Sequence, residues 1–304
     1  MSNKRKPITQ SSILICGPVR NVANGISDEL DVIAAATSSF KSTYYLLIES
    51  DSSDETLKKL KEQEESRQNF FYQSMGNLTE KFTKRTQRIA FCRNAIVDEV
   101  KNNPRFKDLD YVMMADLDGM NHLITKEKIE QCWELDEDWD VLAANQGENY
   151  YDIWALRHPL WCPDDCWQLK EQLELIMSSD DAENLAVRSR QPIIDPRSDL
   201  IEVDSAFGGL AIYKKKAFIS GRYEGLDQNN KEIADHVLFH KQLKQAGYRI
   251  FINPALINCA KYPEKLASIS VKPPKFIFKV IKNLGIRFFG KKRFNKYLDQ
   301  LKAY

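Results

Sequence analysis

Short runs of mainly apolar residues alternate with longer amphipathic stretches along the first half of the chain. The apolar runs predict buried strands over residues 12–16, 43–48, 69–73, 111–115 and 140–144. Periodic apolar positions between these runs predict helices over residues 28–40, from Leu57 onward and over residues 80–101. Strands that alternate with helices through short connections predict a mostly parallel central sheet flanked by helices. The fold class is therefore expected to be α/β.

The second half of the chain resumes this pattern after an interruption. Residues 161–200 are mixed and polar, with helical character over 167–177, and indicate an insertion or a substrate-binding region. A glycine-led strand is expected over 206–213, a helix over 232–245 and a further strand over 248–252. Residues 1–271 are expected to form one domain.

The composition narrows the class of protein. Of the 304 residues, 43% are apolar and 29% are charged, which is ordinary for a soluble globular chain. No apolar run is long enough for a transmembrane helix or for the core of a secretion signal. The closely spaced Cys162 and Cys166 lack a second Cys/His pair, which disfavours zinc. We expect free thiols and a cytoplasmic protein.

The charge is unevenly distributed. Residues 272–304 hold ten Lys/Arg and one Asp, so the net charge of +1 divides into +9 there and −8 over residues 1–271. Ile277, Ile281 and Phe288 fall on one face of a helix in this tail. A cationic amphipathic helix suits an anionic membrane surface, here the cytosolic face, although docking on the acidic body is an alternative. No motif for binding nucleic acid is present.

Two carboxylates separated by one residue follow the predicted strand over 111–115. Asp116 and Asp118 precede Gly119, where the backbone is expected to turn sharply. Paired carboxylates at the end of a buried strand are costly unless a cation lies between them, and ligands of α/β proteins bind at this end of the sheet. Oxygen ligands that leave room for phosphates suit Mn²⁺ or Mg²⁺. An Asp-rich turn without a ligand is the alternative interpretation.

Five segments in order resemble the GT-A (Rossmann-like) fold of nucleotide-sugar glycosyltransferases, over roughly residues 12–262. They are a strand and turn at 13–21, an acidic Ser-rich loop at 49–56, the aspartates at 116–118, a Gly-Gly strand at 207–213, and a helix start at 234–236 followed by Ala-Gly-Tyr-Arg-Ile at 246–250. Within this fold, Arg93-Asn94, residues 151–157 and Asp235-His236 look most similar to the capsule-associated and Golgi mannosyltransferases of fungi. The resemblance implies a GDP-mannose or UDP-sugar donor.

The resemblance also implies roles for individual residues on the donor side. Asp118 is the expected direct metal ligand, and Asp116 would lie nearer the ribose and reach the metal through water. The residues expected to contact the donor nucleotide are Pro18, Arg20, Asn21, Glu49, Asp51, Arg88, Arg93, Asp116 and Leu117. The arginines suit diphosphate oxygens, whereas capping of the next helix is an alternative role for Asp51.

On the acceptor side, Asp235 opens a helix where inverting members of the fold keep a catalytic base. Such a base takes the proton of the acceptor hydroxyl, although the helix dipole alone also favours a carboxylate there. Many members have Glu-Asp where this chain has Asp235-His236, so His236 is a candidate third metal ligand and the stereochemistry stays open. The residues expected at the acceptor or sugar are Tyr151, Asp152, Trp154, Gly208 and Gly209. The aromatic members of this set also fit a hydrophobic core.

Taken together, these patterns predict a metal-dependent glycosyltransferase that moves a sugar from a nucleotide donor to a hydroxyl of a glycan or glycolipid. One alternative is a nucleotidyltransferase that makes sugar nucleotides, although residues 17–21 are a poor version of its glycine-rich first loop. Another is a non-catalytic glycan-binding module of the same fold, against which the intact Asp116, Asp118 and Asp235 count.

Overall fold

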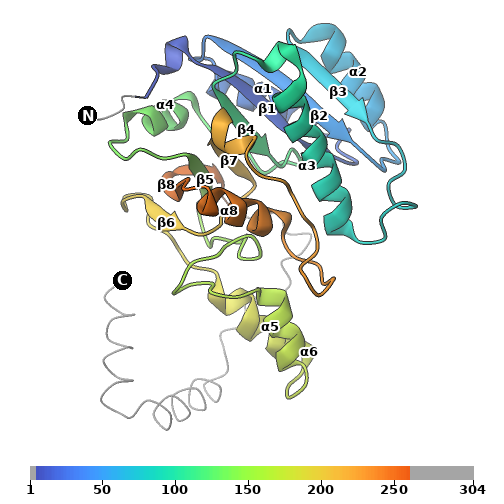
Figure 1. The fold of residues 1–304 in the computed structure, drawn as a ribbon, viewed down its shortest axis with the longest axis vertical. Coiled ribbons are helices and arrows are strands. Elements are labelled where there is room, and N and C mark those ends of the chain that lie inside the picture. The colour runs from blue at the N-terminus through green and yellow to red at the C-terminus, as the bar shows by residue number, and fades with distance from the viewer. Residues whose placement is uncertain (1–4, 261–304) are drawn as a thin grey trace. The chain divides into compact units, whose positions relative to one another are not determined.

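In a computed structural model, residues 5–260 are described, and the predicted basic tail at 272–304 lies outside the described residues. Eight described strands form one sheet in the order β3-β2-β1-β4-β7-β5-β8-β6 (Figure 1). Their bounds are β1 (Ser12–Val19), β2 (Ser42–Glu49), β3 (Phe70–Ser74), β4 (Tyr111–Ala115), β5 (Val141–Gln146), β6 (Ile201–Val203), β7 (Leu210–Lys214) and β8 (Ile250–Cys259).

The sheet is mostly parallel. Strands β3, β2, β1 and β4 pair in parallel, and so do β5 and β8. Strand β7 runs antiparallel to both of its neighbours, β4 and β5, and the short β6 runs antiparallel to β8. The expected α/β class with a mostly parallel central sheet is confirmed.

Helices cover both faces of this sheet. The α-helices are α1 (Ile26–Ala36), α2 (Thr56–Ser66), α3 (Arg85–Asn102), α4 (Lys126–Glu134), α5 (Cys166–Leu173), α6 (Ser179–Ala186), α7 (Lys215–Phe218) and α8 (Asp235–Gln245), and 3₁₀ turns lie at Ile8–Gln10, Pro104–Phe106 and Arg188–Arg190. Within β1, Leu14 and Cys16 pack on the side of α3 and α8, whereas Ile13 and Ile15 pack on the side of α1 and α4. Because both faces are buried, the strands appear in the sequence as continuous apolar runs.

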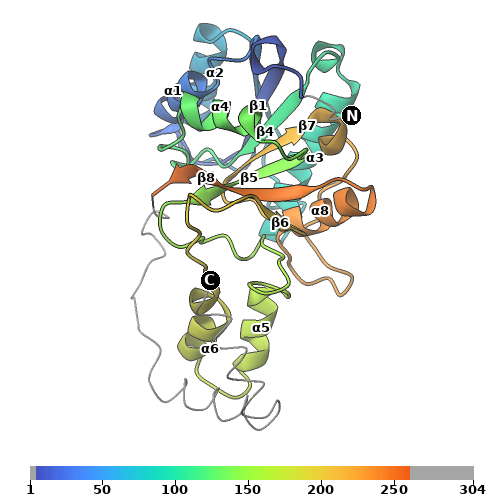
Figure 2. The same ribbon diagram turned by 90° about the vertical axis from the view of Figure 1, so that its left-hand side faces the viewer.

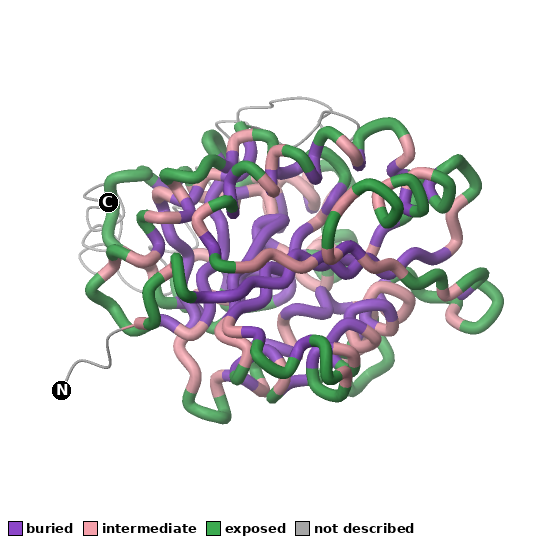
Figure 3. Tube along the Cα trace, turned by 90° about the horizontal axis from the view of Figure 1, so that it is seen from above, coloured by how far each residue is buried: buried purple, intermediate pink, exposed green. Residues whose placement is uncertain are grey.

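Burial follows the same layers. Figure 3 shows buried residues gathered in the central strands and exposed residues in the outer loops and helices. Among residues 5–260, no helix combines the length and apolar composition that crossing a bilayer requires.

Several element bounds differ from the predicted ones for identifiable reasons. Helix α3 begins at Arg85 rather than at residue 80, because the preceding loop folds back and Thr79 donates to Asp51. Helix α8 begins at Asp235 rather than at residue 232, because residues 227–231 form a turn closed by hydrogen bonds between Asp227 and Lys231. Helix α4 and strand β6 were not predicted.

The insertion between β5 and β6 carries two helices. Helices α5 and α6 pack against each other and extend away from the sheet (Figure 2). The predicted single helix over 167–177 is therefore shorter and is followed by a second helix, because Ser178 accepts a hydrogen bond from the Asp181 amide and starts α6.

Candidate active site

The carboxyl ends of β1, β2 and β4 meet the beginnings of β7 and α8 around a cavity of about 360 Å³. This is the edge at which parallel sheets bind ligands, and the volume suits a small molecule. The structure brings most of the predicted site residues together in the lining: Pro18, Arg20, Asp51, Arg88, Arg93, Asp116, Leu117, Asp118, Tyr151, Asp152, Trp154, Asp235 and His236.

Two predicted nucleotide contacts, Glu49 and Asn21, are absent from the lining and instead hold a loop. Glu49 is 2% exposed, and its carboxylate accepts from the Ser52 amide at 2.9 Å and from the Ser74 hydroxyl at 2.5 Å. Asn21 adopts a left-handed φ of 54°, and its side-chain oxygen accepts from the Ser53 amide at 2.8 Å. Because these groups already have partners inside the protein, they shape the loop after β2 and are not among the cavity-lining residues.

The two predicted acceptor glycines also lie behind the cavity wall. A Cβ on Gly208 would stand 2.7 Å from the Ala144 carbonyl oxygen, and its φ of 67° is left-handed, so both space and conformation require glycine. The Gly208 amide donates to Asp152 at 3.0 Å, and the Gly209 carbonyl accepts from the Asp116 amide at 2.9 Å. These glycines therefore position the acidic residues of the wall.

Asp116 and Asp118 leave β4 as an acidic turn, and Gly119 follows with a φ of 98°, as the sequence predicted. Desolvation raises the pKa of Asp116 to about 6, with Arg93 opposing the rise and Asp118 adding to it. Desolvation and the nearby Glu29 raise the pKa of Asp118. The carboxylates of Asp116, Asp118 and Glu29 therefore lie near enough to repel one another, and a cation at the turn would offset this repulsion.

The donor set at this turn fits a hard divalent cation. Asp116 uses Oδ1 to accept from Arg93, whereas within residues 5–260 no side chain donates a hydrogen bond to the Asp118 carboxylate. Carboxylate oxygens that are left open toward a cavity are ligands typical of Mg²⁺ and Mn²⁺. However, no three His, Cys, Asp or Glu side chains of the described part are grouped so as to hold a metal ion. The structure therefore does not bring His236 beside the two aspartates as a third ligand.

Arg93 connects the acidic turn with α8. Its guanidinium donates to Asp235 at 2.5 Å and to Asp116 at 3.1 Å, and the residue is 5% exposed. The rings of Phe207 and Tyr223 lie 5.0 and 5.7 Å from the guanidinium carbon. Although Arg93 was expected to contact the diphosphate, it is held by two carboxylates and two rings of the protein itself.

Arg85 is a cavity-lining cation that the sequence analysis left out of the donor site. It opens α3 and is exposed, and its charge opposes in small part the rise in pKa of Asp116 and Asp118. Arg88 lines the same wall, but its guanidinium donates to the Phe82 carbonyl at 2.7 Å. The sequence signal for Arg85 is its place in the first turn of the helix that precedes the strand ending in Asp116 and Asp118.

Asp235 and His236 form the wall at the start of α8. Asp235 is 6% exposed, and its Oδ2 has no hydrogen-bond partner among the described residues. His236 is 2% exposed and stacks on Phe207 with ring centroids 3.9 Å apart, and its Nε2 likewise has no partner there. Burial, then Arg93 and His240, hold the pKa of His236 well below its ordinary range, so the ring is neutral. Buried polar atoms without partners in a cavity wall are positions that a ligand's hydroxyl groups can satisfy.

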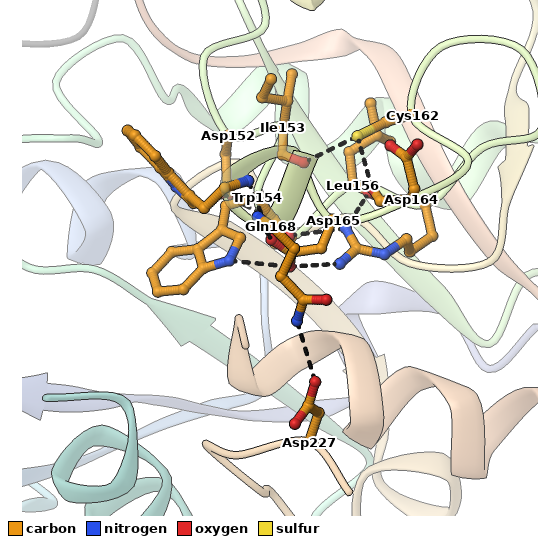
Figure 4. Close-up of polar contacts among 12 residues, drawn as sticks. Asp152, Ile153, Trp154, Leu156, Cys162, Asp164, Asp165, Gln168 and Asp227 are labelled. Carbon is orange, nitrogen blue, oxygen red and sulfur yellow. Dashed lines mark hydrogen bonds and ion pairs between the residues drawn. The ribbon is translucent and has the colours of Figure 1, made fainter. Parts of the chain in front are cut away.

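The opposite wall is anchored through Asp165. Its Oδ2 accepts from the indole nitrogen of Trp154 at 3.1 Å and from Arg157 at 2.9 Å, while Oδ1 caps α5 by accepting from the Trp167 and Gln168 amides (Figure 4). The indole of Trp154 is thus fixed by its polar edge. Aromatic rings held in this way can stack on the apolar face of a sugar.

Asp152 is a second carboxylate of this wall. Its oxygens accept from the Gly208 amide at 3.0 Å and from the Ala155 amide at 3.3 Å. Desolvation nevertheless raises the pKa of Asp152 to about 7, and the charge of Asp116 adds to the rise. The side chain therefore carries a proton in part of the molecules at neutral pH.

Comparison with known proteins gives no family for the chain. No protein-family model matches it, and no curated protein matches it. Similar solved structures include the mannosyltransferase PcManGT from Pyrobaculum calidifontis in complex with GDP-Man and Mn²⁺, at 14% identity and a TM-score of 0.49, covering 94% of this chain and 65% of that one.

TarS 1–349 of S. aureus is similar at 13% identity and a TM-score of 0.45, covering 91% of this chain and 65% of that one. The same protein in complex with UDP-GlcNAc gives 15% identity, a TM-score of 0.46 and coverages of 91% and 66%. The chain thus spans about two thirds of the length of these structures.

Proposed function

We propose that the chain is a metal-dependent glycosyltransferase with a GT-A fold, acting on a nucleotide-sugar donor and a hydroxyl acceptor. One observation carries this proposal. A single cavity at the carboxyl edge of the sheet holds the open carboxylate of Asp118 and the buried, unpartnered Oδ2 of Asp235. A cation site and a proton acceptor facing the same space are the two groups that glycosyl transfer from a diphosphate requires.

The donor half of the cavity is assigned to the first part of the chain. Asp118 and the second oxygen of Asp116 would hold Mn²⁺ or Mg²⁺, which neutralises the charge that develops on a leaving diphosphate. Arg85 is free to bind the diphosphate, because no ion pair within the described residues engages it. Pro18, Arg20 and Asp51 border the space left for the nucleoside.

The acceptor half is assigned to the second part of the chain. Asp235 Oδ2 accepts the proton of the attacking hydroxyl, while Arg93 fixes the carboxylate by binding Oδ1. The neutral His236, whose Nε2 has no partner among the described residues, orients a neighbouring hydroxyl. This role replaces the metal-ligand role expected from the sequence. Trp154 supplies a stacking surface and Asp152 a hydrogen-bonding edge.

The finer specificity concerns the donor sugar and the acceptor. The resemblance of Arg93-Asn94 and residues 151–157 to fungal mannosyltransferases favours GDP-mannose over a UDP-sugar, with a glycan or glycolipid as acceptor. A cytoplasmic site of action and membrane contact through residues 272–304 stay predictions. The nucleotidyltransferase alternative is not favoured, because residues 17–19 continue β1 as a strand and form no glycine-rich loop.

Titration calorimetry on the full chain tests the proposal. GDP and UDP are titrated with and without Mn²⁺, and we expect binding that strengthens with the metal. Asp118→Asn should abolish the gain from Mn²⁺, whereas Asp199→Asn, at an exposed position away from the cavity, should leave it unchanged. Nucleotide binding that is the same with and without Mn²⁺ would contradict the metal-dependent mechanism.

A further inference from the structure

We propose that Glu29 is a positioning residue that holds the acidic turn after β4 in the shape that lets Asp118 bind a divalent cation. The inference rests on the proposed function, because it concerns the metal site assigned there. Glu29 belongs to α1, does not line the cavity, and played no part in the sequence-based site.

The contacts of Glu29 are directed at the turn. Its Oε2 accepts from the Gly119 amide at 2.7 Å, and its Oε1 accepts from the Asn121 amide at 3.1 Å and from the Asn121 side chain at 2.8 Å. The same Asn121 side chain donates to the Asp116 carbonyl at 2.7 Å. Glu29 is 6% exposed and Asn121 is fully buried. The buried carboxylate of Glu29 thus binds the backbone after Asp118 directly and holds the backbone before it through Asn121.

The turn needs such a support at Asp118 and Gly119, which are exposed. Gly119 has a φ of 98°, and a Cβ added there would meet nothing within 4 Å. Within the described residues its backbone is held by Glu29 at the amide and by the His122 ring, 3.2 Å from the carbonyl oxygen. Residues 116–122 form bends and turns outside any helix or strand. Freed from Glu29, the segment would sample other conformations, and the Asp118 carboxylate would lose its fixed direction.

The charge of Glu29 is the second part of the argument. A buried carboxylate is costly, and the charge of Glu29, which binds the amide of Gly119, repels the neighbouring carboxylate of Asp118. An uncharged amide or carbonyl oxygen could accept hydrogen bonds without that repulsion. The carboxylate, in contrast, adds negative potential at the place where a divalent cation would bind. Glu29 therefore favours cation binding in two ways, by fixing the position of Asp118 and by adding negative electrostatic potential, as outer-shell carboxylates of metal sites do.

The test measures metal affinity separately from stability. In the full chain, GDP and UDP are titrated in the presence of increasing Mn²⁺, and unfolding in urea is followed in parallel. Glu29→Gln keeps the size of the side chain but removes its charge and turns one acceptor into a donor. We expect the apparent affinity for Mn²⁺ to fall about 10–100-fold, with Glu29→Asp lying between this variant and the native chain.

Asp110→Asn is the matched control. Asp110 lies just before the opposite end of β4 and accepts from the Ser12 amide at 2.9 Å, so this substitution also weakens a carboxylate–backbone contact, but far from the turn. We expect it to lower stability and to leave the Mn²⁺ affinity unchanged. An equal loss of Mn²⁺ affinity in both variants would show a purely structural role for Glu29 and overturn the inference.

The two hypotheses fail in different ways. If Asp118→Asn abolishes the Mn²⁺ effect but Glu29→Gln retains native Mn²⁺ affinity, the inference about Glu29 is wrong and the proposed function stands. If Asp118→Asn leaves the Mn²⁺ effect intact, the metal site itself is misplaced. Should Glu29→Gln fail to fold, the milder Glu29→Asp carries the test, and native Mn²⁺ affinity in that variant would overturn the inference.

Discussion

Arg93 donates to Asp235 at 2.5 Å, and the two side chains are only 6% and 8% exposed. Breaking a buried ion pair from one side leaves an uncompensated charge, which costs about 3–5 kcal/mol. Arg93→Met should therefore lower the free energy of unfolding by about that amount in urea denaturation. Arg197→Met removes an ion pair whose arginine is 89% exposed and should cause no measurable change.

A double variant separates the pair from general damage. Arg93→Met combined with Asp235→Asn should cost less than the two single substitutions added together, because only Asp116, and no longer Asp235 as well, is then left as a charge without its arginine. Strict additivity of the two free-energy changes would show that the pair contributes nothing as a pair.

Asp165 both caps a helix and forms a buried ion pair. Its removal should therefore lower the free energy of unfolding by more than the removal of a residue that only caps a helix. Asp165→Ala removes the cap of α5, the acceptor for Trp154 and the partner of Arg157, which is 13% exposed. We expect a loss of about 3–5 kcal/mol in unfolding free energy. Ser178→Ala, which removes only the cap of α6, should cost about 1 kcal/mol. Similar losses for both would argue against the anchoring of Trp154 by Asp165.

Gly208 is required by space as well as by backbone conformation. Gly208→Ala should destabilise the protein by about 2–5 kcal/mol, since the new Cβ meets the Ala144 carbonyl oxygen in addition to the left-handed backbone cost. Gly76 has a similar φ of 64° but nothing within 4 Å of a Cβ, so Gly76→Ala should cost only about 1–2 kcal/mol. Thermal unfolding of the two variants side by side isolates the steric part.

The raised pKa of Asp152, about 7, makes stability depend on pH in a defined direction. Between the ordinary carboxyl pKa and 7, the folded chain binds more protons at this site than the unfolded chain does. The stability that Asp152 contributes is therefore fully present at low pH. It is lost as the pH rises toward 7, by about 1.4 kcal/mol of unfolding free energy for each pH unit between the two pKa values. Melting temperatures measured from pH 5 to 8 should fall more steeply for the native chain than for Asp152→Asn. An equal fall in melting temperature with pH in the two proteins would contradict the raised pKa of Asp152.

The strands were predictable because each is buried on both faces and appears as an apolar run. Their directions were not, since nothing in the run from Leu210 to Lys214 distinguishes a parallel from an antiparallel neighbour. Strand β6 was missed because three residues are too few for a pattern. The positions of Asp116 and Asp118 in the cavity were predictable from the end of a buried strand, whereas that of Asp235 was implied by the resemblance to glycosyltransferases.

The hydrogen-bond and ion-pair partners of individual side chains could not be predicted from the local sequence pattern. Arg93 and Asp235 are 142 residues apart in sequence, and Glu29 and Asn121 are 92 apart. The only sequence signal for Glu29 is a carboxylate on the helical face shared by Ile26, Leu30 and Ile33, where an apolar residue is expected. Such a misplaced charge indicates a buried partner but does not identify it.

The reversed direction of β7 also bears on how this cavity can diversify. Since β7 runs against β4 and β5, its start reaches the same edge as the ends of its neighbours, and the 63 residues between β5 and β7 leave and return there. That excursion supplies Tyr151, Asp152, Trp154 and Phe207, while Asp116 and Asp118 come from earlier in the chain. Replacement of residues 147–209 by a segment from a relative would thus change what the cavity accepts and leave the acidic turn at Asp116 and Asp118, the proposed cation site, unchanged.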